Sequence, residues 1–507
     1  MKKDIRCFSY IKAFLNKIVL VLILLLLKCS GTIAQRVYLN ARLEGTKGDS
    51  AIVYFYPYFS YFWQNSNATE YNAPVSNNKF SFESKLQCSH SYITCYLKNE
   101  NSYRLICHLF LIVPGDSIQI TIRKDTVLFA GRGAEKFVCQ NEIQKVPEIN
   151  FTRGELLSFK NNTTDLEFNR YNKKKSDSIL KLKLDIVEKF KRALQKEVYK
   201  QVRLNLISEN LLNQYKSLSL DFRYDSSESL SARSDKITFF KDLEECSLPK
   251  DLDDKLLAES SSASDYLLFQ AIRKVQFENY LLKKPLPVSY DPLDLARRAA
   301  GAHGQTLKEK LFALSFNLFY RPENEKDIGK LNMALSETKS FYFHNYLMEL
   351  KTAMNPGLQA FDFTLHDTDD HKITLKDFKG KVVILDFWFT GCTYCVWLEK
   401  RMKKIRDFFK QDTSVAFIGV NLDTKKSTFL NGLASRIYTG ENEMNLYTGG
   451  SAFEHPLVKH YQITGCPELV IIDKRQRTFA SKPARPVDET TDREFINLIL
   501  KAENLRN

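Results

Sequence analysis

Two cysteines, Cys392 and Cys395, are separated by two residues and follow an apolar segment, 382–389, that has strand character. In the residues directly after them, 396–402, apolar side chains recur at helical spacing. The pair is therefore expected at a helix N-terminus, where unpaired N–H groups and the helix dipole favour a thiolate. Cys392 would then attack a disulfide, and Cys395, one turn further along, would resolve the mixed disulfide.

A structural zinc site is the alternative for this spacing. Such a site needs a second pair of Cys or His ligands at similar spacing. His455 and His460 follow in the sequence, but no second Cys-x-x-Cys pair accompanies them. The strand–turn–helix context therefore favours a redox-active dithiol that needs no metal and no other cofactor.

The N-terminus has the pattern of an export signal. Five cations within the first 17 residues precede an unbroken apolar run, 18–27, and small residues occupy the two positions that a signal peptidase reads before a cut after Ala34. We expect a signal peptide that is cleaved after Ala34 and a soluble mature protein outside the cytoplasm. The apolar run is shorter than the ~20 residues of a transmembrane helix. Lipidation of Cys29 is the alternative, although Lys28 stands where a small residue is expected.

The chain carries an excess of positive charge. The formal net charge is +14, and removal of residues 1–34 would take away six cations and one anion, leaving +9. The remaining charge is spread along the chain without a basic stripe of interleaved aromatic residues, so we expect no nucleic-acid partner. Contact with a membrane is expected only through the signal segment or through a lipid on Cys29.

The sequence pattern changes twice along the 507 residues, which are too many for a single core. Short apolar or alternating segments come first, helical periodicity follows, and strand–helix alternation ends the chain. The predicted fold class is multidomain α+β, with an N-terminal β-rich domain, a central all-α domain and a C-terminal α/β domain with a mixed sheet. The predicted boundaries are 1–34 for the signal peptide, 35–148 for the β-rich domain, 149–354 for the helical domain and 355–507 for the α/β domain.

Individual elements are predicted from the same patterns. Strands are predicted at 37–43, 51–55, 79–82, 92–97, 105–110, 118–122, 361–365, 373–375, 382–389, 415–420 and 468–473. Helices are predicted at 179–202, 266–282, 307–319, 328–350, 396–402 and 492–505, and a loop is predicted at 221–236.

Several further cysteines lie outside the dithiol. Cys95 and Cys107 are equidistant from a predicted hairpin loop centred near Asn101. In that register they would sit opposite each other, close enough for a disulfide, although a slip of one residue would separate them. Cys139 and Cys246 are explained at least as well as small buried apolar residues.

Three segments accompany the dithiol: 375–383 leads into the central strand, Asp386-Phe387-Trp388 lies within it, and 461–473 contains Cys466-Pro467. With Cys392-Thr393-Tyr394-Cys395, they make the C-terminal ~150 residues resemble the thioredoxin superfamily, and within it the exported TlpA/ResA-like thiol–disulfide oxidoreductases. The β-rich part resembles the small β domain found upstream of such modules in Gram-negative bacteria. A thioredoxin fold and thiol–disulfide exchange are what this resemblance implies.

The resemblance also implies roles for individual residues. Cys392 matches the nucleophile and Cys395 the resolving thiol, and the two form the redox disulfide. Pro467 matches the cis-proline that faces the dithiol and presents backbone to a substrate chain. Asp386 matches the buried acid that takes the proton of Cys395, with a pKa raised by desolvation. Trp388 is expected to pack beneath the active-site turn.

Two positions depart from the family pattern. Gly391 stands where a tryptophan usually precedes the first cysteine. Cys466 stands before the cis-proline, where Thr, Val or Ile is commoner. It is either a small packed residue or a third thiol, and a third thiol could bind Cu(I) with the other two or form an alternative disulfide.

We therefore predict a periplasmic thiol–disulfide oxidoreductase, more specifically a disulfide reductase, because neither residue between the cysteines is cationic. Its partners would be exported proteins with disulfides and a membrane electron donor that recharges the dithiol. The alternative is a non-catalytic thiol- or metal-binding module that uses Cys392, Cys395 and Cys466. A peroxiredoxin-type peroxidase is disfavoured, because Thr390 lies only two residues before the first cysteine and no proline precedes it.

Overall fold

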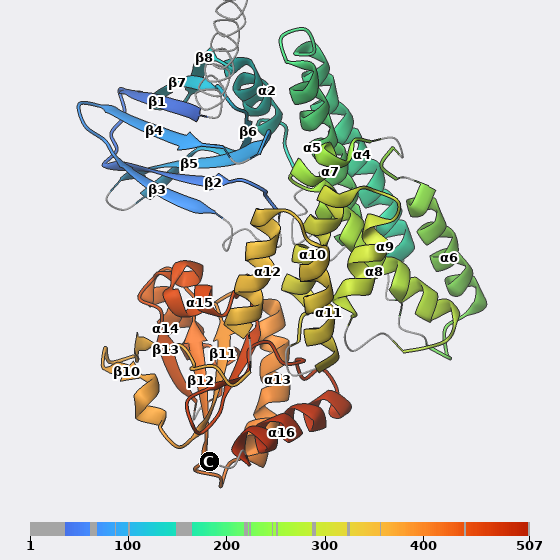
Figure 1. Cartoon of the computed structure of the whole chain (residues 1–507), viewed down its shortest axis with the longest axis vertical. Helices are drawn as coiled ribbons and strands as arrows, with labels where there is room; N and C mark the ends of the chain where they lie inside the picture. The colour runs from blue at the N-terminus through green and yellow to red at the C-terminus, as the bar shows by residue number, and fades with distance from the viewer. Residues whose placement is uncertain are drawn as a thin grey trace, which may run out of the picture. The chain divides into compact units, whose positions relative to one another are not determined.

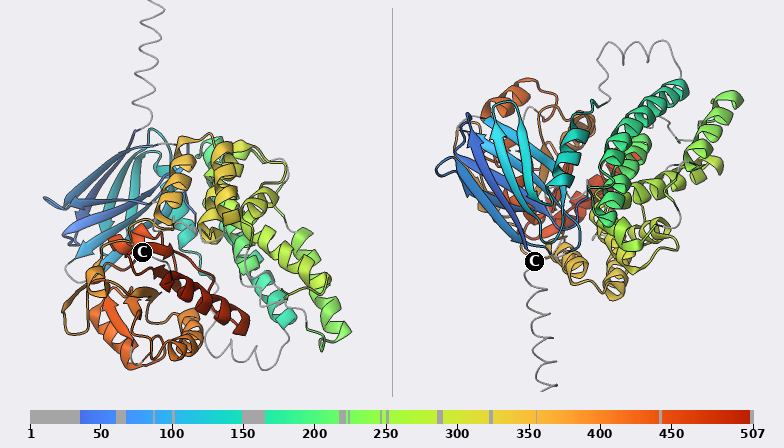
Figure 2. Two further views of the ribbon diagram at one scale, coloured as in Figure 1. Left: turned by 60° about the horizontal axis from the view of Figure 1, so that its bottom comes forward. Right: turned by 90° about the horizontal axis from the view of Figure 1, so that it is seen from above.

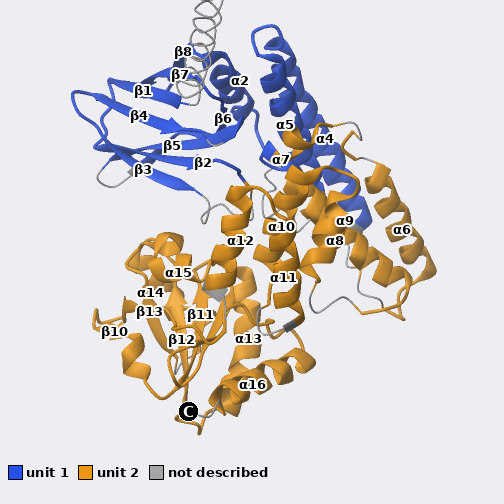
Figure 3. Cartoon of the chain, viewed as in Figure 1, with its two compact units in different colours: residues 1–59, 67–214, 259–263 blue, residues 60–66, 215–258, 264–507 orange. Residues whose placement is uncertain are grey.

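The structure is a computed structural model of the chain. The chain forms two compact units (Figure 3): residues 1–59, 67–214 and 259–263 make up unit 1, and residues 60–66, 215–258 and 264–507 make up unit 2. The structure describes residues 36–60, 68–86, 88–99, 102–148, 165–216, 222, 225–245, 247–249, 252–285, 290–321, 325–354, 356–440 and 443–504.

Several predictions fall outside the described residues. They are the signal peptide with its cleavage after Ala34, the lipid site at Cys29, the hairpin loop at Asn101 and the environment of Cys246. The division into units runs through the helical region, and the predicted boundaries at 148/149 and 354/355 stay predictions. In the described part of the chain, none of the helices combines the length and the apolar character that a bilayer-spanning segment requires.

Unit 1 contains two four-stranded sheets that face each other across an apolar core (Figure 1, Figure 2). The strand orders are β4-β1-β7-β8 and β3-β2-β5-β6. In β1, Val37, Leu39, Ala41 and Leu43 are buried in alternation, which is the period of two expected for a strand with one buried face. The strands are β1 Arg36–Glu44, β2 Ser50–Tyr56, β3 Thr69–Pro74, β4 Lys79–Lys85, β5 Ser91–Asn99, β6 Ser102–Ile112, β7 Ser117–Arg123 and β8 Val127–Arg132.

All six strands predicted for this part are present, and β3 and β8 are additions. Both additional strands lie at the edges of their sheets. Ala73 is the single buried residue of β3, and β8 has none, so neither strand has the apolar alternation that would have predicted it. Helix α2, Ala134–Gln144, lies in a stretch that the sequence analysis assigned to β-structure, and that assignment is wrong there.

A buried ion pair joins the turn before β7 to helix α2. Asp116 Oδ1 accepts a hydrogen bond from Lys136 Nζ at 2.5 Å, and Asp116 Oδ2 accepts one from the N–H of Val113 at 2.8 Å. Gly133 precedes α2 with a φ of 86°, and a Cβ on Gly133 would lie 2.1 Å from Asp116 Oδ1. Only glycine therefore leaves room for this pair.

Cys95 and Cys107 lie opposite each other in the antiparallel pairing of β5 and β6, in the predicted register. Both thiols are fully buried and free. Burial raises the pKa of the Cys95 thiol to about 12. Cys139 is also free and buried, as expected for a small apolar residue.

Two long helices follow in unit 1, α4 at Asp165–Lys189 and α5 at Lys196–Lys216. The prediction of one continuous helix over 179–202 is wrong. The chain turns between the two helices, and Leu194 in that turn is buried and keeps the helical spacing. Because neither glycine nor proline marks the break, periodicity alone could not locate it.

Unit 2 begins with a helical region. The predictions at 266–282 and 307–319 are confirmed, but the single helix predicted over 328–350 is two helices. At this break, the two carboxylate oxygens of Glu309 accept hydrogen bonds from the backbone N–H groups of Lys339 and Ser340, at 2.7 and 3.0 Å. The loop predicted at 221–236 is wrong from Leu230, where α6 begins. The helices are α6 Leu230–Glu245, α7 Asp254–Glu259, α8 Ala263–Leu281, α9 Pro292–Ala300, α10 Gln305–Phe319, α11 Glu325–Glu337 and α12 Phe341–Met354.

The C-terminal part of unit 2 is a seven-stranded mixed sheet with the order β10-β9-β13-β12-β11-β14-β15. The central strand β11 pairs in parallel with β12 and antiparallel with β14. Helices α13 and α16 pack on the face that carries Ile384, and α15 packs on the face that carries Leu385 (Figure 1). The strands are β9 Thr364–His366, β10 Lys372–Thr374, β11 Val382–Trp388, β12 Val415–Asn421, β13 Met444–Tyr447, β14 Glu468–Ile472 and β15 Thr478–Ala480. The helices are α13 Thr393–Phe408, α14 Lys426–Ala434, α15 Pro456–His460 and α16 Glu489–Glu503.

In chain order, the protein thus consists of two β-sheets, a helical region and a mixed sheet with helices on both faces, which is the predicted fold class.

Candidate functional site

The dithiol lies where β11 ends and α13 begins. Cys392 is the N-cap residue of α13, and its Sγ accepts a hydrogen bond from the N–H of Cys395 at 3.1 Å. Cys392 and Cys395 are bonded to each other in this structure, with an S–S distance of 1.99 Å. Their residues are 5% and 3% exposed, so the disulfide is only narrowly accessible to a large partner. After reduction, the same backbone N–H would stabilise a thiolate on Cys392.

The turn that carries Cys392 is fixed by two side chains from later in the chain. The N–H and hydroxyl of Thr390 donate to the carboxylate of Asp423, at 3.1 and 2.7 Å. The N–H of Gly391 donates to the hydroxyl of Tyr438 at 2.8 Å. Gly391 has a φ of 96°, a left-handed conformation that disfavours a tryptophan at this position.

Trp388 packs beneath this turn, as predicted. It is 1% exposed, belongs to the apolar cluster that contains both cysteines, and stacks on the Tyr438 ring at 5.4 Å. Tyr438 therefore supports the site twice, through its ring and through its hydroxyl. The sequence analysis missed Tyr438 and Asp423, because no local pattern connects them with a turn more than 30 residues earlier.

Pro467 and Cys466 lie beside the dithiol. The peptide bond between them is cis, the configuration that the resemblance implies. The backbone oxygen of Cys466 is 3.7 Å from Cys392 Sγ. The Cys466 thiol is free, and burial raises its pKa well above the usual value.

Asp386 lies on the side of β11 that faces α13. Successive residues of a strand point to opposite faces, so Asp386 shares its face with Ile384 and Trp388. Ile384 packs against α13, and Trp388 packs against the two cysteines. Asp386 is 5% exposed, and burial together with the negative charge of Glu443 raises its pKa well above the usual value.

A cluster of charged side chains surrounds Asp386 beneath α13. Arg406 donates hydrogen bonds to Glu399, one turn after the dithiol, and to Glu443 Oε2 at 3.1 Å. Burial raises the pKa of both Glu399 and Glu443. We call Glu399, Arg406 and Glu443 the acid cluster. The sequence analysis did not identify it, although Glu399 and Arg406 are seven residues apart and so share a helix face.

Asp367, Asp369 and His371 are the one set of His, Cys, Asp or Glu side chains among the described residues whose ligand atoms all lie within 4.8 Å of one another. They sit on a turn between β9 and β10, away from the dithiol in the sequence. The sulfurs of Cys392, Cys395 and Cys466 do not form such a set in this oxidised state.

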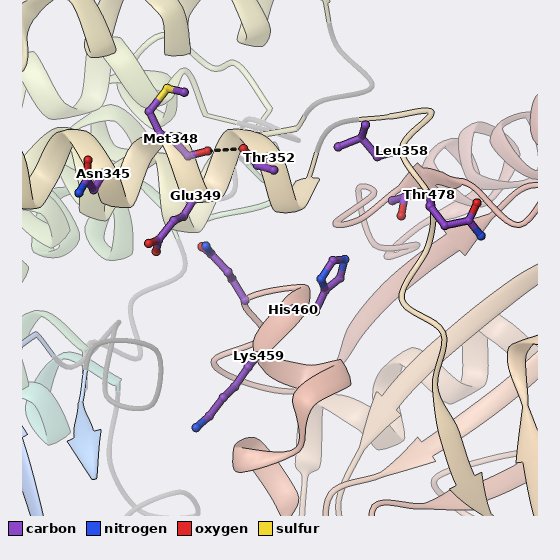
Figure 4. Close-up of a pocket in the computed structure, with 10 residues that line it drawn as sticks. Asn345, Met348, Glu349, Thr352, Leu358, Lys459, His460 and Thr478 are labelled. Carbon is purple, nitrogen blue, oxygen red and sulfur yellow. Dashed lines mark hydrogen bonds between the residues drawn. The ribbon is translucent and has the colours of Figure 1, made fainter.

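A cavity of about 530 Å³ lies between α12 and the segment around α15 (Figure 4). Met348, Glu349 and Thr352 line it from α12, and Lys459 and His460 line it from α15. None of the predicted site residues lines this cavity. The dithiol, with Trp388 and Cys466 packed against it, is the candidate functional site.

Comparison with known proteins agrees with this geometry. Residues 380–478 match the family model described as thioredoxin-like. These residues form a thioredoxin-like domain. The domain is related to ResA/TlpA-type thiol–disulfide oxidoreductases, and the regions before it remain unassigned to any family.

Two relatives of the thioredoxin-like domain are named thiol-disulfide oxidoreductase ResA. The protein of Bacillus cereus is 28% identical over 144 residues, which are 28% of this chain and 78% of the relative. The protein of Bacillus subtilis is 31% identical over 97 residues, which are 19% of this chain and 52% of the relative. The chain thus spans only about half the length of the second relative.

Solved structures resemble part of this chain. One is the thioredoxin domain of a thiol-disulfide oxidoreductase from Bacteroides vulgatus, which is 26% identical. The match covers 28% of this chain and 99% of that structure, with a TM-score of 0.25.

Proposed function

We propose that this protein is a thiol–disulfide oxidoreductase that acts through Cys392 and Cys395. One observation carries the proposal: Cys392 Sγ sits at the N-cap of α13, accepts the N–H of Cys395, and lies 3.7 Å from the backbone of Cys466 beside Pro467. After reduction, this arrangement would favour a thiolate on Cys392, with a resolving thiol one turn away and an adjacent backbone edge for a substrate chain. The ResA proteins named above support the same activity by similarity.

The reaction would proceed by two exchanges. The Cys392 thiolate attacks one sulfur of a substrate disulfide, so that a Cys392–substrate bond forms and the other substrate sulfur leaves as a thiolate. Cys395 then gives its proton to Asp386 and attacks Cys392 Sγ. The Cys392–Cys395 bond forms, the second substrate sulfur leaves, and two electrons have passed to the substrate.

We propose further that the protein works as a reductase outside the cytoplasm, on exported proteins with disulfides, and that a membrane electron donor recharges its dithiol. Neither residue between the cysteines, Thr393 or Tyr394, is cationic, and this supports electron flow from the dithiol to the substrate. A reductase requires a reduction potential near that of thioredoxin, about −270 mV, and not the value of about −120 mV that is typical of a strong oxidant. Equilibration of the full chain with glutathione buffers measures this potential.

Insulin reduction by dithiothreitol tests the activity itself. The full chain should accelerate it, and Cys392→Ser should reduce the acceleration to the uncatalysed rate. Cys395→Ser should retain the attack but accumulate a mixed disulfide, which mass spectrometry detects. Cys88→Ser, in unit 1, is the matched control and should be as active as the wild type. Equal activity of Cys392→Ser and the wild type would exclude the proposal.

A further inference from the structure

The acid cluster is not explained by packing alone. Glu443 is buried, with 1% of its side chain exposed, and Arg406 has 14% exposed. Burying charged groups costs free energy unless each is paired. Glu443 Oε2 has two partners, Arg406 and the N–H of Gly440, both at 3.1 Å. Its other oxygen, Oε1, is buried and has no hydrogen-bond partner among the described residues.

The charges of Asp386 and the acid cluster together do not balance. Asp386, Glu399 and Glu443 are three carboxyl groups, and among the described residues Arg406 is the one cation that hydrogen-bonds to any of them. Arg485 also faces Asp386, but Arg485 Nη2 lies 3.2 Å from Glu468 and pairs with that carboxylate. Burial raises the pKa of all three carboxyl groups, and the negative charges of Glu443 and Glu399 raise that of Asp386 further.

The sheet brings the segment around Glu443 close to Asp386. Asp386 pairs in register with Gly419 of β12, and Gly419 pairs with Asn445 of β13. An added Cβ on Gly419 would lie 2.3 Å from Asn445 Oδ1, so a side chain at this position would collide with it. The strand that begins directly after Glu443 therefore packs close to the face of Asp386.

We propose that Glu443, held by Arg406, is a positioning residue that sets the pH at which Asp386 can accept the proton of Cys395. This inference rests on the proposed function. Five groups interact electrostatically with Asp386: Glu443 before β13, Glu399 and Arg406 on α13, Arg485 after β15, and the Cys466 thiol before β14. Of the charged ones, Glu443 is the strongest influence, and its negative charge opposes ionisation of Asp386.

The proton balance follows from the resolving step. Cys395 S–H transfers its proton to the ionised carboxylate of Asp386, and the resulting thiolate attacks Cys392 Sγ in the mixed disulfide. The step therefore requires Asp386 to be ionised before it begins. Removing the charge of Glu443 favours the ionised form, so the pH midpoint of the resolving step should move to lower pH.

Reaction of the reduced full chain with the small disulfide DTNB separates the two steps. The first released thionitrobenzoate reports the attack by Cys392, and the second reports the resolution by Cys395. In Glu443→Gln, we expect the midpoint of the second phase to fall by about one pH unit, which is roughly a tenfold faster resolution below the wild-type midpoint. The first phase should be unchanged.

Asp492→Asn is the matched control. Asp492 lies on α16 and pairs with Arg401 of α13, not with Arg406, so its substitution should leave both phases unchanged. Glu399→Gln is a second test if Glu443→Gln fails to fold, and it should shift the second phase in the same direction by a smaller amount. A second phase with the wild-type midpoint in folded Glu443→Gln would overturn the inference. Loss of biphasic release from the wild type would instead overturn the proposed function.

Discussion

The thiol of Cys466 distinguishes the two functions that the sequence left open. Burial raises its pKa well above the usual value, so it should stay protonated near neutral pH. We expect iodoacetamide at pH 7.5 to modify Cys392 of the reduced chain at least about 100-fold faster than Cys466, because the thiolate is the reactive form. Mass spectrometry of peptides from a labelling time course measures both rates.

Cys466→Ala provides the comparison for this measurement. Its Cys392 should react at the wild-type rate, and its stoichiometry of bound Cu(I) should equal that of the wild type. Equal labelling of Cys392 and Cys466, or a loss of Cu(I) in Cys466→Ala, would favour the metal-binding alternative.

The site residues that are neighbours in the chain, or that belong to one compact motif, could be predicted from the sequence. Cys392 and Cys395 are three residues apart, and Asp386 precedes them on the same strand–turn–helix segment. Tyr438 and Glu443 could not be located in this way. They reach the site only because β12 and β13 pair in parallel, and this register depends on contacts across the whole sheet.

The turn before β7 and helix α2 depend on the pair of Asp116 and Lys136. Both side chains are 4% exposed, and burial raises the pKa of Asp116 and lowers that of Lys136. In Asp116→Ala, Lys136 would remain buried without its counter-charge, which costs about 3–5 kcal/mol. Hydrogen–deuterium exchange should show a corresponding loss of protection in β7 and α2.

The double variant Asp116→Ala/Lys136→Met tests the cause of this loss. A buried pair replaced by apolar side chains is often neutral for stability, so most of the protection should return. If the double variant exchanged as fast as Asp116→Ala, the hydrogen bond from Val113 to Asp116, and not the uncompensated lysine, would be the source of stability.

In unit 1, strands with one buried and one exposed face were predicted correctly. The strand of unit 1 whose residues are all at least partly exposed was not predicted. Strands such as β1 and β7 alternate clearly between buried and exposed residues, and both were predicted. The edge strand β8 has no buried residue and gave no signal. The break between α11 and α12 is held by Glu309, whose carboxylate comes from another helix, so no local residue marks it.

At the scale of the whole molecule, Lys482 connects the thioredoxin-like part of unit 2 with the helical region. It follows β15, is 3% exposed, and its Nζ donates to the backbone oxygen of Asn317 on α10 at 3.2 Å. The side-chain oxygen of Asn317 in turn accepts a hydrogen bond from the hydroxyl of Tyr346 on α12 at 2.8 Å. Part of the helical region thus completes the burial of a side chain that belongs to the C-terminal segment.

Burial lowers the pKa of Lys482 to about 8, below the value of about 10.4 expected in the unfolded chain. A lowered pKa means that protonation opposes folding: the cost is absent above pH ~10.4, grows as the pH falls, and is complete below pH ~8. Lys482→Met removes this cost and one hydrogen bond. We expect its free energy of unfolding to exceed that of the wild type by about 1–3 kcal/mol at pH 6.5, and the difference to shrink by pH 9.5.

Urea unfolding followed by tryptophan fluorescence measures this difference, since Trp388 and Trp397 both lie in the thioredoxin-like domain. Lys410→Met, at an exposed position of the same domain, should show no change between the two pH values. A Lys482→Met difference that is equal at pH 6.5 and 9.5 would mean that the lysine stays solvated. The hydrogen bond from Lys482 to α10 would then contribute nothing to the coupling between the helical region and the thioredoxin-like domain.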